Sequence, residues 1–151
     1  MAHTALTVAK YFLALPDKDS GELISNLKLQ KLLYYAQGYH VAIHGINEPL
    51  FHEKLYAWKH GPVVKSVYNH FSNYGSKALP SGELPTVFSS NTKLLLDDIH
   101  SVFGRFSAWA LREMTHRESP WVDNYDSEVK DVEISLKDLH SFFLQHVKKT
   151  K

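Results

Sequence analysis

Cysteine is absent from the 151-residue chain. Disulfides, thiolate metal ligands and a cysteine nucleophile are therefore excluded. The absence is typical of a cytoplasmic protein, and we expect that location. No run approaches the roughly 18 apolar residues of a membrane helix, and no basic segment precedes the apolar residues near the N-terminus. We therefore expect neither a membrane span nor a signal peptide.

A strong charge of either sign is also lacking, since the formal net charge is +1. Non-specific binding to nucleic acid needs a concentrated basic surface, so the charge balance argues against a nucleic-acid partner. Gly-rich phosphate loops, serine nucleophile elbows and zinc-finger spacings are absent as well. Hydrophobic residues make up 44% of the chain and charged residues 22%, which is typical of a globular protein. We expect one domain over residues 1–151.

The longest periodic stretch begins at Leu27 and predicts a central helix over about residues 26–44. Ser25 or Asn26 is the expected cap, and Gly45 the expected end. The fold class is predicted as mainly α, a compact domain of about six helices around this central helix. A short two-stranded β element could pair residues 56–58 with 132–134. The other helices are expected over residues 4–15, 62–74, 92–106, 108–115 and 136–147.

Two histidines on the central helix, His40 and His44, are four residues apart and could present two imidazoles to a metal ion. His52 or His60 could add a third ligand. The glutamate of the metalloprotease pattern is missing. The alternative is that both histidines are partly exposed polar residues near a helix end, and we expect no metal or cofactor.

His60 and His116 each lie at an expected helix boundary beside a proline and an aromatic residue. Each could bond free backbone groups at a helix end. Alternatively, the two could converge on one pocket with Trp58 or Trp121 as its wall, as in a small hydrolase or a metal-assisted enzyme. No nucleophile or second acid is marked out there, so we expect no enzyme.

Lys28 and Lys31 lie in the first turns of the central helix, where a cation opposes the helix dipole. Glu22, Asp131 or Glu133 could pair with them. Alternatively, they could project outward to an acidic partner. Together with Tyr35 they share a face that the fold does not obviously require, and we expect function there.

Four segments in this order resemble the Panacea domain, the family of SocA-like antitoxins also described as phage-associated GepA-type proteins. They are LKLQKLLYYAQG at residues 27–38, PLF at 49–51, AWKHGPVV at 57–64, and 111–121 with THRE and PW. The resemblance spans about residues 6 to 145. Its implied partner-binding positions are Lys28, Lys31, Tyr35, Trp58, His60, Gly61, Pro62, His116 and Trp121.

The resemblance implies a mainly helical antitoxin that neutralises a cognate toxin by direct protein contact. The toxin is expected to be encoded by a neighbouring gene. One branch of the family is linked to delivery of its toxin to the ClpXP protease, which makes that protease a second expected partner. The family has no established catalytic residues to carry over.

Overall fold

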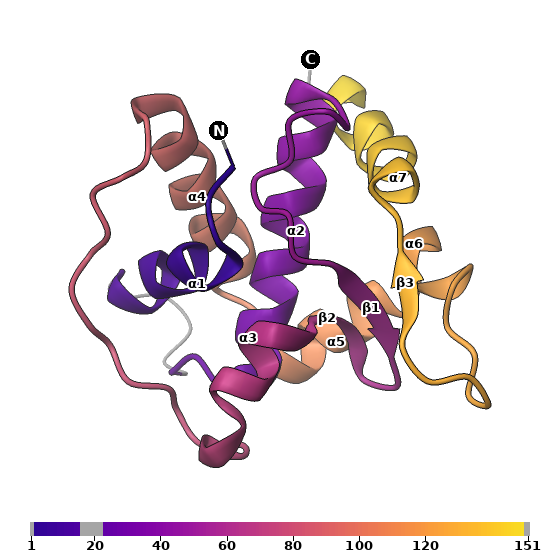
Figure 1. Ribbon diagram of the computed structural model, residues 1–151, viewed down its shortest axis with the longest axis horizontal. Helices are drawn as coiled ribbons and strands as arrows, with labels where there is room; N and C mark the ends of the chain where they lie inside the picture. The colour runs from indigo at the N-terminus through magenta and orange to yellow at the C-terminus, as the bar shows by residue number, and fades with distance from the viewer. Residues whose placement is uncertain (1, 16–22, 150–151) are drawn as a thin grey trace.

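The computed structural model describes residues 2–15 and 23–149. Seven α-helices, one 3-10 helix and a three-stranded sheet lie within these ranges (Figure 1). The mainly α prediction with a short β element is therefore confirmed. In chain order the elements are α1 (Ala5–Ala14), α2 (Asn26–His44), β1 (Leu55–Trp58), β2 (Gly61–Val64), α3 (Lys65–His70), η1 (Ser72–Tyr74), α4 (Ser90–Phe103), α5 (Ala108–Thr115), α6 (Ser119–Val122), β3 (Val132–Ile134) and α7 (Leu136–Lys149).

Helix α2 is the central element, and its predicted bounds are confirmed. Ser25 caps it by accepting a hydrogen bond from the backbone N–H of Lys28 at 3.3 Å, and Gly45, with φ 95°, ends it. In Figure 1 the helix runs upright through the middle, between α1 and α4 on one side and α7 on the other. Buried residues face all sides of it, as expected of a helix that is contacted from several directions.

Helix α7 packs closely on α2 through a glycine in the middle of α2. A Cβ atom built on Gly38 would overlap the ring of Phe143. An aromatic ring fills the space, since a glycine without a side chain leaves room for it.

The segment at His60–Pro62 was expected to start a helix, and that expectation is wrong. Residues 61–64 form strand β2, which pairs antiparallel with β1 across a two-residue turn, with Trp58 opposite Gly61. Gly61 has φ 109°, a conformation that residues with a side chain rarely adopt. Pro62 is tolerated because β2 is an edge strand in the order β2-β1-β3. The helix begins only at residue 65.

Strand β1 also pairs antiparallel with β3, with Tyr56 opposite Glu133, as the sequence suggested. Helix α5 has its predicted bounds, and Thr4 and Ser135 cap α1 and α7. Helix α4 starts earlier than expected because Ser89 caps it. The single turn of α6 was not predicted. Within the described ranges, no helix combines the length and apolar character that crossing a membrane requires.

Candidate functional site

The face of α2 that contains Lys28, Lys31 and Tyr35 is buried. Lys28 and Lys31 have 0% exposure and Tyr35 has 1%. Residue type favoured exposed lysines, because lysine is rarely buried without a partner. In the fold, the hairpin, α5 and α4 cover this side of the helix. The alternative in which the two lysines project outward is therefore wrong, while the role of these positions in partner binding stays a prediction.

Both lysines donate hydrogen bonds to backbone carbonyls of distant segments. The Nζ of Lys28 lies 2.6 Å from the carbonyl oxygen of Gly104, and the Nζ of Lys31 lies 3.2 Å from that of Pro62. Each bond satisfies a carbonyl where α2 meets another part of the fold.

Two of the expected carboxylate partners pair with other lysines. Asp131 lies 2.7 Å from Lys65, and Glu133 lies 3.4 Å from Lys54. Glu22, the third, lies outside the described residues. Asp131 and Glu133 therefore pair with lysines outside α2, and the expected ion pairs with Lys28 and Lys31 are not formed by them.

The two glutamines of the motif act on backbone groups in the same way. Gln30 accepts a bond from the N–H of Val64 at 2.9 Å. Gln37 accepts from Leu50 N–H at 2.8 Å and donates to the carbonyl of Phe51 at 2.7 Å. Burying a side-chain amide costs free energy unless the amide is hydrogen-bonded, and these bonds offset that cost. The polar positions of the motif therefore fasten the hairpin and the connector to α2.

The carboxylate of Glu118 accepts hydrogen bonds from two neighbouring tyrosines of α2. The hydroxyl of Tyr34 donates at 2.9 Å and that of Tyr35 at 3.0 Å. Burial raises the pKa of Glu118 to about 7, although the two hydroxyls and Arg117 oppose the shift. The second half of the motif is thus tied to the first by a buried carboxylate that titrates near neutral pH.

His116 and Trp121 form a stack next to the hairpin. Their ring centroids are 3.9 Å apart with planes 6° from parallel, and Tyr125 stacks on the far side of Trp121 at 4.7 Å. The indole N–H of Trp121 donates to the carbonyl of Trp58 at 2.7 Å. These contacts hold the turn after α5 against β1.

A groove of about 780 Å³ opens between the start of α2, the β1–β2 turn and the segment around residues 75–78. Apolar atoms make up most of its lining surface, while Lys31, the turn residues Lys59 and His60, and neutral polar residues such as Asn26 and Gln30 supply the rest. None of its described lining residues is an aspartate or a glutamate. The groove therefore combines apolar walls with basic groups, and we call it the hairpin groove.

Lys31 lies at the inner side of the hairpin groove. Burial, with a smaller contribution from the charge of Arg112, lowers the pKa of its ammonium to about 7. Among the described residues, no carboxylate forms an ion pair with it. A Cβ on Gly61 would lie 2.5 Å from its Cε atom, so the glycine makes room for this side chain.

An exposed aromatic residue borders the hairpin groove at α5. Trp109 is 57% exposed, and its ring centroid lies 6.0 Å from that of His60. The guanidinium of Arg112 stacks over the same indole at 4.3 Å and donates through Nε to Nδ1 of His60 at 2.9 Å. Burial and the adjacent Arg112 charge lower the pKa of His60.

The predicted pocket around His60 and His116 is formed only in part. His60 and Trp58 line the hairpin groove, whereas His116 and Trp121 are not among its lining residues. The recorded hydrogen bond of the His60 side chain comes from Arg112. The arrangement holds His60 in place and pairs it with neither a nucleophile nor a carboxylate among the described residues.

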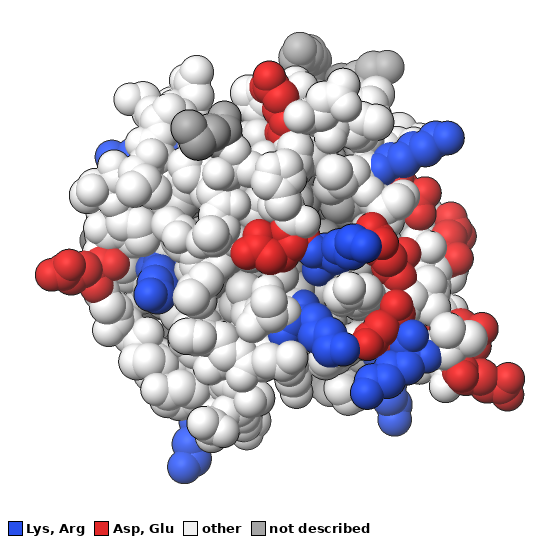
Figure 2. All heavy atoms as spheres, in the orientation of Figure 1, with Lys and Arg blue, Asp and Glu red and all other residues white. Residues whose placement is uncertain are grey.

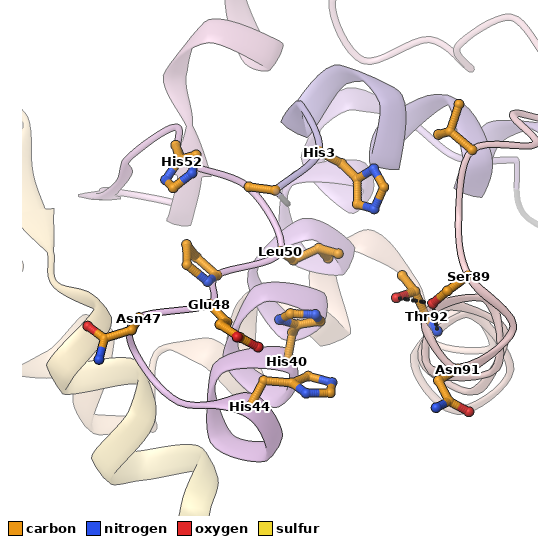
Figure 3. Close-up of a pocket in the computed structure, with 13 residues that line it drawn as sticks. His3, His40, His44, Asn47, Glu48, Leu50, His52, Ser89, Asn91 and Thr92 are labelled. Atoms are coloured by element: carbon orange, nitrogen blue, oxygen red, sulfur yellow. Dashed lines mark hydrogen bonds between the residues drawn. The ribbon is translucent and has the colours of Figure 1, made fainter.

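A second cavity, of about 630 Å³, lies at the opposite end of α2 (Figure 3). His40 and His44 stand side by side there with ring centroids 4.4 Å apart, and His3 and His52 come from other segments. Burial and the His44 charge lower the pKa of His40 to about 4. Across the described chain, no three His, Asp or Glu side chains are arranged to hold a metal ion.

Basic and acidic residues alternate on the surface. Figure 2 shows lysines and arginines intermingled with acidic side chains on one half of the viewed face, with isolated charges on the other half. This face carries no continuous basic surface of the kind that binds a nucleic-acid backbone.

Sequence reasoning missed four residues of this region: Leu23, Trp109, Arg112 and Glu118. Glu118 lies in the quoted THRE segment, but its two tyrosine partners are more than 80 positions away. A tryptophan three residues before an arginine on one helix face was a readable signal for a stacked pair. Nothing in the sequence placed either residue beside the hairpin.

Comparison with known proteins identifies one family. Residues 29–122 match the family described as "Antitoxin SocA-like, Panacea domain". Antitoxin SocA of Caulobacter vibrioides (strain NA1000 / CB15N) is 35% identical over 111 residues, which cover 65% of this chain. The match spans 58% of that relative's length. No solved structure matches the chain.

Proposed function

The chain belongs to the antitoxin SocA-like, Panacea-domain family, and we propose that it neutralises a cognate toxin protein by binding it directly in the cytoplasm. The family match carries this proposal, since its matched segment contains α2 from residue 29 onward, the hairpin and α5. Those elements surround the hairpin groove. The chain acts as one domain that presents this surface, and it has no catalytic role.

The surface chemistry supports binding to a protein. Trp109 and Arg112 stack at the border of an apolar groove, and Leu23 is 70% exposed beside it. Tryptophan and arginine are the residues most enriched among those that dominate protein interfaces. His60, in contrast, accepts a bond from Arg112, and His116 stacks on Trp121, and neither is paired with a nucleophile among the described residues.

Co-expression tests the proposal. The candidate toxin is the product of the gene next to this one, induced in a bacterial host with and without this chain. We expect the chain to restore colony formation and to co-purify with the toxin. Persistent toxicity with no complex, although the chain is soluble and folded, would contradict the proposal.

The same strains separate two routes of neutralisation. If binding alone blocks the toxin, its level stays constant and the complex is stable. If the chain delivers the toxin to ClpXP, the toxin level falls and deletion of the protease restores it. A ClpX-deficient host in which the chain still rescues growth assigns the function to binding alone.

A further inference from the structure

The hairpin groove has a charge character that selects its occupant. Lys31, Lys59 and His60 line it, and Arg112 bonds to His60 at its border. Acidic side chains are missing from its described lining. A basic segment entering here would meet like charges with no counter-charge, whereas an acidic one would be attracted.

Apolar walls accompany this positive charge. Leu27, Trp58, Val63 and Tyr68 line the hairpin groove, and Trp58 and Tyr68 pack edge to face at 5.0 Å. A purely acidic segment would leave these walls uncovered. Large apolar side chains next to the acidic group would cover them, which is the usual source of interface free energy.

We propose that the hairpin groove is the toxin-binding surface and that it takes a segment of the toxin in which an acidic side chain adjoins large apolar side chains. This inference rests on the proposed antitoxin function. The apolar side chains lie against Trp109 and the groove walls. The carboxylate lies at the mouth of the hairpin groove, over Lys59 and His60. There the positive charge of Lys31, which lies deeper, attracts it.

Lys31 makes this binding proton-linked. The titratable or charged groups around it are His60 and Lys59 from the hairpin and Arg112 and His116 from the end of α5. None of these four groups supplies a negative charge, and the nearby carboxylate of Glu113 is paired with Arg112 at 2.8 Å. A bound carboxylate raises the pKa of Lys31 above its value of about 7 in the free protein. The complex therefore takes up a fraction of a proton at pH 8, and the affinity falls as pH rises from 7 to 9.

Substitutions of exposed side chains test the hairpin groove without disturbing the core. We expect Trp109→Ala and Lys59→Glu each to weaken toxin binding at least about tenfold and to impair rescue. Leu94→Ala and Lys93→Glu are matched controls on α4, where Leu94 is 62% exposed, and they retain full binding. Circular dichroism confirms that all four variants are folded. If both groove variants rescue as well as the controls, the groove assignment is wrong although the antitoxin function stands.

A random dodecapeptide library displayed on phage identifies the preferred chemistry independently of the toxin. Selection on the wild-type protein is expected to enrich Asp or Glu next to aromatic or long aliphatic residues. Selection on Trp109→Ala should lose that enrichment. Basic peptides, or the same peptides on both proteins, would overturn the proposal. Enrichment as expected with a toxin that is not neutralised would instead contradict the antitoxin function alone.

Calorimetry of an enriched peptide at pH 8, in phosphate and in Tris, measures the proton uptake. The wild type is expected to take up a fraction of a proton, and Lys31→Met none. The peptide is also expected to bind Lys31→Met with an affinity independent of pH between 7 and 9. Zero uptake by the wild type would overturn the role of Lys31. If Lys31→Met does not fold, the affinity of the wild type between pH 7 and 9 still tests the role of Lys31, because an affinity that does not fall over this range would overturn it.

Discussion

The two ends of α2 each adjoin a cavity that is lined by a basic side chain whose pKa is lowered by burial. At the N-terminal end, Lys31 adjoins an apolar groove of about 780 Å³. At the C-terminal end, His40 adjoins a cavity of about 630 Å³ that contains further histidines. Burial is the largest cause of a lowered pKa at both ends, to about 7 for Lys31 and about 4 for His40.

The difference lies in what each group does near neutral pH. His40 is neutral at pH 7, so its burial places no charge inside the protein. Lys31 is about half charged at pH 7 and is held where that charge has no ion-pair partner among the described residues. Burying an unpaired charge is costly, so the N-terminal end is the one that stores unfavourable electrostatic energy. A partner's carboxylate would relieve it.

Gly61→Ala is expected to have the largest effect, with Gly45→Ala as its matched control at the opposite end of α2. Both glycines have positive φ, and strain alone costs about 1–3 kcal/mol of unfolding free energy. At Gly61 the new Cβ would also lie 2.5 Å from Lys31 and 2.8 Å from Thr115, whereas nothing lies within 4 Å at Gly45. Overpacking adds about 1–3 kcal/mol. Urea denaturation measures the difference, and equal losses would contradict the packing argument.

Lys31→Met is expected to remove a pH dependence of stability. The folded pKa of about 7 lies below the unfolded value of 10.5, so unfolding takes up a proton between these values. The unfolding free energy of the wild type therefore rises with pH from 7 to 9, by up to about 1.4 kcal/mol per unit. The variant should lack this contribution. Urea denaturation of both proteins at pH 7, 8 and 9 measures this contribution. If the unfolding free energy changes with pH by the same amount in both proteins, the prediction is refuted.

His40→Leu is expected to have the smallest effect. The folded pKa of about 4 lies below 6.5, so this group makes stability rise with pH between about 4 and 6.5. The ring is partly exposed, which limits the contribution to about 1 kcal/mol or less. Glu118 acts in the opposite direction between 4.5 and 7, so only the difference between variant and wild type is informative. A change larger than that for Lys31→Met would reverse the comparison of the two ends.

Local signals predicted the helices well. Ser25 caps α2 as expected, because a cap depends on a few adjacent residues. The helix start predicted at Gly61 and Pro62 is wrong, because this pair is compatible both with a helix start and with a hairpin on an edge strand. Only the pairing of β1 with β2 decides between them.

The candidate site could be predicted far less well. Residue type alone assigns a lysine such as Lys31 to the surface, and its burial follows from a glycine 30 positions later that leaves space for it. The hairpin groove joins segments that are distant in sequence, so no periodicity reveals it. Trp109 is unremarkable in its own helix and gains significance only from its place beside His60.

The bonds from α2 to distant backbone also bear on how the chain can be divided. Gln37, Gln30, Lys31 and Lys28 reach groups 13 to 76 positions away along the chain. A fragment that ends before Gly104 would keep the central helix but lose the carbonyl that Lys28 binds. We expect such a fragment to collapse without fixed packing, so a shortened version that still folds must retain the chain at least through α5.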